Sequence, residues 1–212
     1  MTEKNLVPVW DILVRVFHWS LVLTFTIAYF TEDDFEELHI YAGYAVLGLI
    51  CFRVIWGFIG SRYARFSNFI YSFTEIKSYL NSLLTKKPKH YLGHNPAGGL
   101  MIMVMLISLF ATTLSGIKIY GVQGYGPLAD NGAELSIISK AQAHGDNKHE
   151  DEKEGFEKVE NPEEELWEEI HEFFSNFTLL LIFIHIAGVV VASRVHGENL
   201  VRAMITGKKE NV

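Results

Sequence analysis

The segment HEFFSNFTLLLIFIHIAGVVVAS, residues 171–193, decides the fold that this chain can adopt. After Glu172 it contains no residue of full charge, and it is long enough to cross the hydrocarbon core of a bilayer as an α-helix. It also contains His171 and His185, which are fourteen positions apart. The segment therefore predicts a membrane-spanning helix that carries a polar ring at two different depths.

Three further segments have the same character. Amphipathic helices of a soluble bundle would show polar stripes at a spacing of 3.6 residues, and these segments have none. Their few charged residues, together with Glu172, lie near ends where they can reach lipid headgroups: Arg15, Arg53 and Lys118. We therefore expect an all-α integral membrane four-helix bundle. Its spans would be Ile12–Thr31, His39–Gly60, Gly98–Gly121 and Glu172–Ser193.

The composition supports this interpretation and excludes several classes of protein. The 212 residues are 49% hydrophobic and 20% charged, with a net charge of −7, so charges and apolar residues must be segregated. A single cysteine, Cys51, excludes an intramolecular disulfide and a cysteine-built metal cluster. No C-x-x-C-H motif is present, which excludes covalent haem attachment. The net acidity argues against binding of nucleic acid.

The placement of lysine and arginine predicts the orientation of the bundle. Basic residues gather between the second and third spans and after the fourth: Arg62, Arg65, Lys77, Lys86, Lys87, Lys89, Arg194, Arg202, Lys208 and Lys209. The link between the first two spans is acidic, and residues 122–171 hold four lysines against fourteen acidic residues. Both termini are therefore expected on the cytoplasmic side of one domain, residues 1–212, with an acidic outer loop at residues 122–170.

Two shorter segments have apolar residues on one helical face. They predict amphipathic interfacial helices within Asn68–Thr85 and Asn199–Thr206, lying on the cytoplasmic leaflet. The acidic outer loop allows two interpretations. It is either a solvated segment without a partner or a docking face for a partner outside the membrane.

The intramembrane histidines form two pairs at matching depths. His18 and His185 lie in the inner half of their spans, whereas His39 and His171 begin their spans at the outer surface. His171 and His185 are separated by about 21 Å of helical rise, so they serve two different centres. Two histidines on facing helices suit a non-covalent haem with both axial positions of the iron filled.

Neighbouring residues fit the same interpretation. Gly43 and Gly188 each lie one turn from a histidine and leave room for a flat macrocycle. Arg15 and Arg53 are candidates for pairing with haem propionates, with anchoring to lipid headgroups as the alternative. Zinc is disfavoured, because a structural zinc site needs four ligands close together and these histidines come as separate pairs.

Several motifs resemble a known family. They are R-x-x-H-W (15–19), H-x-x-x-G (39–43), R-x-x-W-G-x-x-G (53–60), A-R-F (64–66), G-H-N-P-A-G (93–98), the pair His171 and His185, and E-N-L-V-R-A-M-I-T-G (198–207). This order resembles the bacterial cytochrome b(561) family, which includes the cytochrome b subunits of nickel-iron hydrogenases. The long acidic loop departs from the compact members.

The resemblance implies a multi-pass protein of the bacterial inner membrane with two haem b groups. His18 and His185 would ligate the inner haem iron, and His39 and His171 the outer one. Such a protein passes electrons between the quinone pool and a periplasmic redox partner, either as an electron-transfer cytochrome or as a quinol/quinone oxidoreductase subunit. A basic c-type cytochrome would complement the acidic loop.

Two other functions remain open at the level of sequence: a haem-independent membrane anchor of a periplasmic oxidoreductase, and a histidine-based proton or metal transporter. The roles of three histidines are also open. His94 is interpreted as part of a helix-start signal, with a quinone or propionate contact as the alternative. His144 and His149 are interpreted as solvated loop residues rather than a surface metal site.

Overall fold

The computed structural model describes residues 6–32, 34–85, 89–129 and 161–210. Most of these residues are helical, and among them four helices are long and apolar enough to cross a membrane. The elements in chain order are β1 (Leu6–Pro8), α1 (Ile12–Phe30), α2 (Glu36–Ile59), the 3-10 turn η1 (Phe66–Asn68), α3 (Phe73–Leu84), α4 (Pro96–Val122), α6 (Pro162–His196), α7 (Leu200–Thr206) and β2 (Lys208–Glu210).

The helices begin at residues that can satisfy the free amide groups of a first turn. Asp11 accepts a hydrogen bond from Val14 N–H at 2.8 Å, and Asn95 accepts one from Gly98 N–H at 2.7 Å. Proline occupies the start of both α4 and α6, where its missing N–H costs nothing. α6 ends at Gly197, which adopts the left-handed conformation at a φ of 68°.

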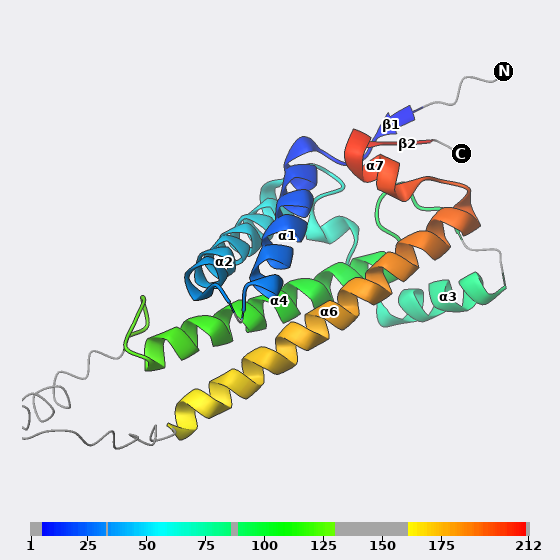
Figure 1. The fold of residues 1–212 in the computed structure, drawn as a ribbon. Helices are drawn as coiled ribbons and strands as arrows, with labels where there is room; N and C mark the ends of the chain where they lie inside the picture. Colours follow the sequence, from blue (N-terminus) through cyan, green and yellow to red (C-terminus); the bar gives the residue numbers. More distant parts are fainter. Residues whose placement is uncertain (1–5, 33, 86–88, 130–160, 211–212) are drawn as a thin grey trace, which may run out of the picture.

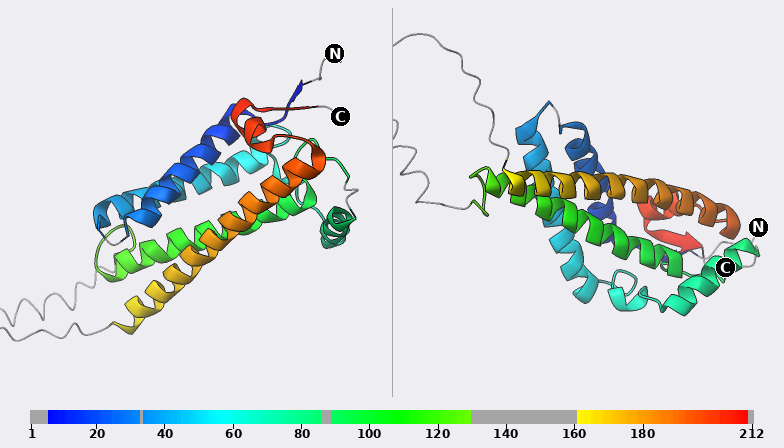
Figure 2. Two further views of the ribbon diagram at one scale, coloured as in Figure 1. Left: turned by 45° about the vertical axis from the view of Figure 1, so that its right-hand side comes forward. Right: turned by 90° about the horizontal axis from the view of Figure 1, so that it is seen from below.

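The four long helices form two pairs, as Figures 1 and 2 show. α1 packs against α2, α4 packs along most of α6, and α2 joins the pairs by packing against α4. Inside the α4–α6 interface, the hydroxyls of Ser108 and Thr178 are 2.7 Å apart and fully buried. Many large apolar side chains on the outside of the bundle are exposed, which suits a surface covered by lipid.

A small two-stranded sheet joins the two ends of the chain. β1 pairs antiparallel with β2, with Val7 opposite Lys209. Beside it, Glu198 accepts hydrogen bonds from both His90 and Lys209, and Lys209 also donates to the Tyr91 carbonyl at 3.1 Å. We refer to this side of the bundle, where the cytoplasmic side is predicted, as the inner end, and to the opposite side as the outer end.

The prediction of an all-α four-helix membrane bundle is confirmed, with a short sheet that the sequence did not predict. The C-terminal interfacial helix is found at α7. Within Asn68–Thr85 the helix begins only at Phe73, because Ser72 and Glu75 form a capping box there.

The prediction of a loop throughout residues 122–170 is wrong at its C-terminal end. α6 begins at Pro162, because Asn161 caps it and Glu163, Glu164 and Glu165 occupy a first turn that favours negative charge. The fourth span is therefore the inner part of a longer helix that projects from the outer end. His144 and His149 lie outside the described residues.

Candidate functional site

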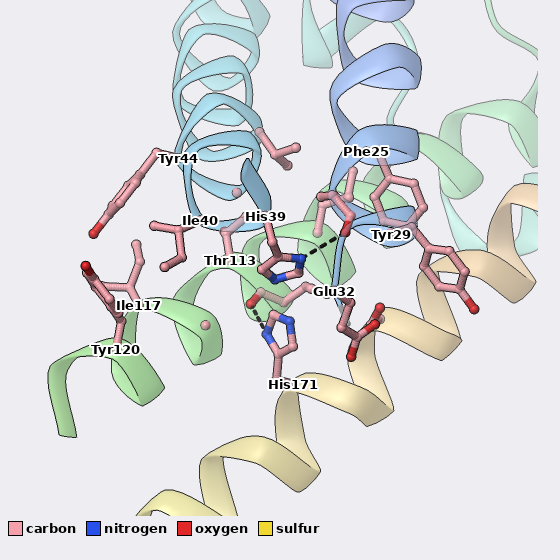
Figure 3. A pocket seen from close by; sticks show the side chains of 17 residues that line it. Phe25, Tyr29, Glu32, His39, Ile40, Tyr44, Thr113, Ile117, Tyr120 and His171 are labelled. Carbon is pink, nitrogen blue, oxygen red and sulfur yellow. Dashed lines mark hydrogen bonds between the residues drawn. The ribbon is translucent and has the colours of Figure 1, made fainter. Parts of the chain in front are cut away.

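A pocket at the outer end contains one of the predicted histidine pairs. His39 from α2 and His171 from α6 lie on opposite sides of it, with ring centroids 6.0 Å apart (Figure 3). The pocket holds about 730 Å³ of space free of protein atoms, its open side included. Its wall is mostly apolar and aromatic, with Glu32 as a carboxylate in the lining. A mostly apolar wall with few polar groups is the character of a site for a cofactor.

Helix α4 fixes the orientation of His171. The Nδ1 atom of its ring lies 2.9 Å from the Thr112 carbonyl oxygen and 3.2 Å from the Ser115 hydroxyl. Gly116 makes this approach possible, because a Cβ atom there would lie 3.0 Å from Cε1 of the His171 ring. The small residues of α4 therefore bring the ring against the backbone of a neighbouring helix.

Helix α1 does the same for His39. Its Nδ1 atom lies 2.8 Å from the carbonyl oxygen of Ala28, which belongs to the last turn of α1. The same carbonyl accepts a longer bond from the Thr31 N–H at 3.3 Å, and a carbonyl oxygen has two lone pairs, so it can accept from His39 as well. Figure 3 shows both this bond and the bond from His171.

These two bonds determine which ring nitrogen carries the proton. A backbone carbonyl only accepts hydrogen bonds, so Nδ1 of each histidine is the donor. In a neutral ring the other nitrogen, Nε2, then keeps its lone pair free. An Nδ1–H donated to a backbone carbonyl is the usual arrangement of a histidine that binds a metal through Nε2.

The second predicted pair meets nearer the inner end. His18 on α1 and His185 on α6 have ring centroids 6.5 Å apart. The hydrogen bonding of this pair differs from that of the outer pair, because Nδ1 of His18 is buried without a hydrogen-bond partner among the described residues. The Trp19 ring packs edge-on against His18 at 5.0 Å.

Both separations suit a metal held between two imidazoles. A metal–nitrogen bond of about 2 Å, with about 1 Å more from the nitrogen to the ring centre, gives about 6 Å between the centres of two opposed rings. α6 is not among the helices that pack closely on α1 or α2, although the histidine pairs bridge these elements. Among the described residues outside its own turn of helix, a Cβ atom added at Gly43, which lines the outer pocket, would meet no atom within 4 Å; the same holds at Gly188, which is exposed. The residues present therefore fit a flat bis-histidine haem in the outer pocket, and the inner pair has a similar ring separation.

The two predicted arginines lie on the inner side of the His18–His185 pair. Arg15 donates from Nη1 to the Ile205 carbonyl at 2.6 Å, and its Nε is buried without a partner among the described residues. Arg53 is only 3% exposed, so the alternative that it anchors to lipid headgroups is wrong for this residue. Its guanidinium carbon lies 5.1 Å from the centre of the Phe66 ring.

His94 is more deeply enclosed than a simple helix-start signal requires. Its ring lies 4.4 Å from that of Trp10 and 4.8 Å from that of Phe69. Burial, together with the nearby charge of Arg53, lowers the pKa of His94 to about 3. The helix-start signal itself is supplied by Asn95 and Pro96. The ring is therefore neutral, and its Nδ1 is buried without a partner among the described residues.

The comparison with known families agrees with this geometry. A family model described as prokaryotic cytochrome b561 matches residues 9–207. The chain belongs to the prokaryotic cytochrome b561 family. The matched region extends from the first buried residue of the inner end, Val9, to the glycine that ends α7. No curated protein and no solved structure was found to match the chain.

Membership in the cytochrome b561 family confirms the resemblance seen in the sequence. The protein is a multi-pass protein of the bacterial inner membrane that transfers electrons across it by means of b-type haem. The number of haems, the residues that ligate them and the redox partners stay predictions. Among the described residues, no cluster of three or more His, Cys, Asp or Glu side chains could hold a single metal ion.

The groups that orient the histidines were not predicted from the sequence. Two of them are backbone carbonyls, those of Ala28 and Thr112, which no sequence motif identifies. Ser115 and Gly116 are two adjacent small residues within the third span. They could have indicated from the sequence that a side chain of another helix approaches closely there. Glu32 lies in a run of acidic residues, so nothing distinguished it from a residue of the solvated link.

Proposed function

We propose that this cytochrome b561 holds two haem b groups, one at each end of the bundle, and passes electrons between membrane quinone and a periplasmic redox partner. His39 and His171 would be the axial ligands of the outer haem, and His18 and His185 those of the inner haem. The observation that carries the proposal is the meeting of four histidines in two opposed pairs, at 6.0 Å and 6.5 Å between ring centroids.

The outer pair supports the proposal most directly. Each ring donates its Nδ1–H to a backbone carbonyl of another helix, which holds Nε2 ready as a ligand. With a histidine on each side, the iron would have no open position for oxygen, which suits electron transfer. Gly43 leaves space for the macrocycle beside His39.

For the inner pair the support comes from charge. A haem carries two propionates, and two arginine nitrogens toward the inner end are buried without a partner among the described residues: Arg15 Nε and Arg53 Nη1. A buried guanidinium without an anion is costly, so a carboxylate brought by the cofactor would stabilise Arg53, which is 3% exposed, and could also pair with the half-buried Arg15.

Iron in each haem supplies a one-electron redox centre, and the chain itself positions and insulates the two centres. The bundle holds the histidine pairs about 21 Å apart along α6 and surrounds them with apolar side chains. Water and ions are thereby kept from following the electron. Since His171 and His185 are rigidly spaced on one helix, this separation is fixed by the fold.

Acidic residues of the outer end suit a basic partner such as a c-type cytochrome. The described part of this surface includes the acidic start of α6, with Glu163, Glu164 and Glu165 in its first turn, and Glu32 at the outer pocket. Opposite charge on a partner would speed encounter, and the gain would fall with salt. A complex whose rate of formation is unchanged between low and high salt would contradict this part of the proposal.

The haem assignment is tested by single histidine substitutions in protein purified in detergent. The dithionite-reduced spectrum and the pyridine haemochrome should give two haems per chain. His185→Ala and His171→Ala should each leave one haem, the outer and the inner respectively. His196→Ala is the matched control, because it removes a histidine from the same helix outside both pairs, and should retain two.

Loss of both haems from either single variant, with the fold retained in circular dichroism, would show that the pairing is wrong. A folded wild-type protein without any haem would favour the membrane-anchor function instead.

A further inference from the structure

Buried nitrogen atoms without partners gather at the inner end. Besides Nδ1 of His18, they are Nε of Arg15, Nη1 of Arg53 and Nδ1 of His94 among the described residues. A buried polar group without a hydrogen bond costs about 1–3 kcal/mol, so such groups are rarely left in that state. Each of these atoms can act as a donor, and together they favour a negatively charged acceptor between them.

The side chain of Arg53 is held in place but not neutralised. It is 3% exposed, and its guanidinium carbon lies over the rings of Phe66 and Phe69, at 5.1 Å and 5.6 Å from their centres. No carboxylate lies within salt-bridge distance of Arg53 among the described residues. The nearby Asp11 is occupied by the Val14 N–H and by the side chains of Ser61 and Trp56. The positive charge of Arg53 is therefore available to a ligand.

His94 packs on the same ring, Phe69, that Arg53 lies over. Its ring centroid is 4.8 Å from that of Phe69, and Trp10 covers it from another direction. The charges of Arg53 and Lys209 disfavour a proton on His94. In the neutral ring with its proton on Nδ1, His94 presents a single donor without adding charge.

We propose that Arg53 and His94 together form a binding site for one propionate of the inner haem. Arg53 would supply the positive charge and His94 a neutral N–H. This rests on the proposed inner haem between His18 and His185. The occupant is a cofactor carboxylate rather than a lipid phosphate, because Arg53 is shielded from the headgroup region. Arg15, one turn from His18, is left for the second propionate.

One consequence is an orientation: the inner haem has its propionates toward the inner end. A second is a redox property. With Arg53 beside it, the propionate stays ionised whether the iron is oxidised or reduced, so the midpoint potential of the inner haem does not depend on pH near neutrality. Without that charge, reduction of the iron would draw a proton onto the propionate.

The test measures the inner-haem midpoint potential against pH in purified two-haem protein. Arg53→Met should lower this potential and make it fall as pH rises, toward one proton per electron, about 59 mV for each tenfold change in proton concentration. Arg53→Lys should largely restore it. Arg62→Met is the control, because Arg62 also lies over an aromatic ring, that of Tyr63 at 5.7 Å, but is exposed.

Substitutions of His94 separate a ligand role from packing. His94→Phe keeps the aromatic contacts with Trp10 and Phe69 but removes the donor, whereas His94→Gln keeps a donor and loses the ring. The proposal expects His94→Phe to lower the inner-haem potential and His94→Gln to stay close to wild type. The opposite order would overturn it, as would an inner-haem potential that Arg53→Met leaves unchanged.

The proposed function is judged separately by the haem count of the wild type and of His185→Ala. If that count is as expected and the His94 and Arg53 variants have wild-type potentials, only the proposed propionate site is wrong. If Arg53→Met does not fold, the comparison of His94→Phe with His94→Gln still decides.

Discussion

Replacing Gly43 by valine should remove the outer haem and leave the helices intact. In the protein alone, a Cβ atom at this position has no neighbour within 4 Å, so valine finds open space. Gly43 also lines the pocket between His39 and His171. The added carbon atoms would therefore collide only with a macrocycle bound there.

The size of the effect follows from the packing. Overfilling a packed site costs about 1–3 kcal/mol, which corresponds to roughly a 5- to 150-fold loss of affinity for the outer haem. The fold itself should gain slightly, because glycine inside a helix is less favourable than most residues by up to about 1 kcal/mol. The pyridine haemochrome should approach one haem per chain, while circular dichroism keeps the helical content.

Gly48 provides the matched control. It lies on the same helix, also has no neighbour within 4 Å of a Cβ, and is exposed away from the pocket. Gly48→Val should keep two haems. If Gly43→Val and Gly48→Val bind the same amount of haem, the pocket does not hold the macrocycle and the reasoning from open space fails.

Three further predictions concern stability. Thr178→Val removes the buried hydroxyl pair with Ser108 and should destabilise the bundle by about 0.6–1.7 kcal/mol in a detergent unfolding titration, and adding Ser108→Ala should cost less than the sum of the two single changes. Gly99→Ala places a Cβ 2.1 Å from the Phe69 carbonyl oxygen, so the thermal midpoint should fall; an unchanged midpoint would mean that this approach is not tight. Burial would raise the pKa of Glu198, but hydrogen bonds from His90 and Lys209 lower it overall from 4.5. The stabilisation from Glu198 is therefore present above pH 4.5 and lost as pH falls below it, so limited proteolysis should release β2 in acid, and Glu198→Gln should release it with little dependence on pH.

Hydropathy and charge predicted the four spans and their connectivity because a bilayer leaves the backbone few alternatives to helices. The depth of each histidine followed from its distance to a span end. The early start of α6 was missed, since acidic residues of a projecting helix have the composition of a solvated loop. For Arg53 the sequence left two roles open, a haem propionate and lipid headgroups, because the packing of Phe66 and Phe69 against it could not be predicted from composition.

The site itself was predictable only in part. Which histidines face one another followed from their depth, and the glycines that leave space were recognised by their spacing. The backbone carbonyls that accept from His39 and His171 depend on how α1 and α4 pack, which a single sequence does not specify. His94 was assigned to the start of α4, because its burial against Trp10 joins segments distant in sequence.

The pairing of β1 with β2 also constrains how the protein is made. β2 follows all four spans in the chain, so the ribosome delivers it only after the last span has been synthesised. Until then the strand at the N-terminus has no partner, and Arg15 lacks the Ile205 carbonyl that holds it. The inner end therefore reaches its final packing only after α6 and the segment that follows it have left the ribosome, so this end is the last part of the bundle to close.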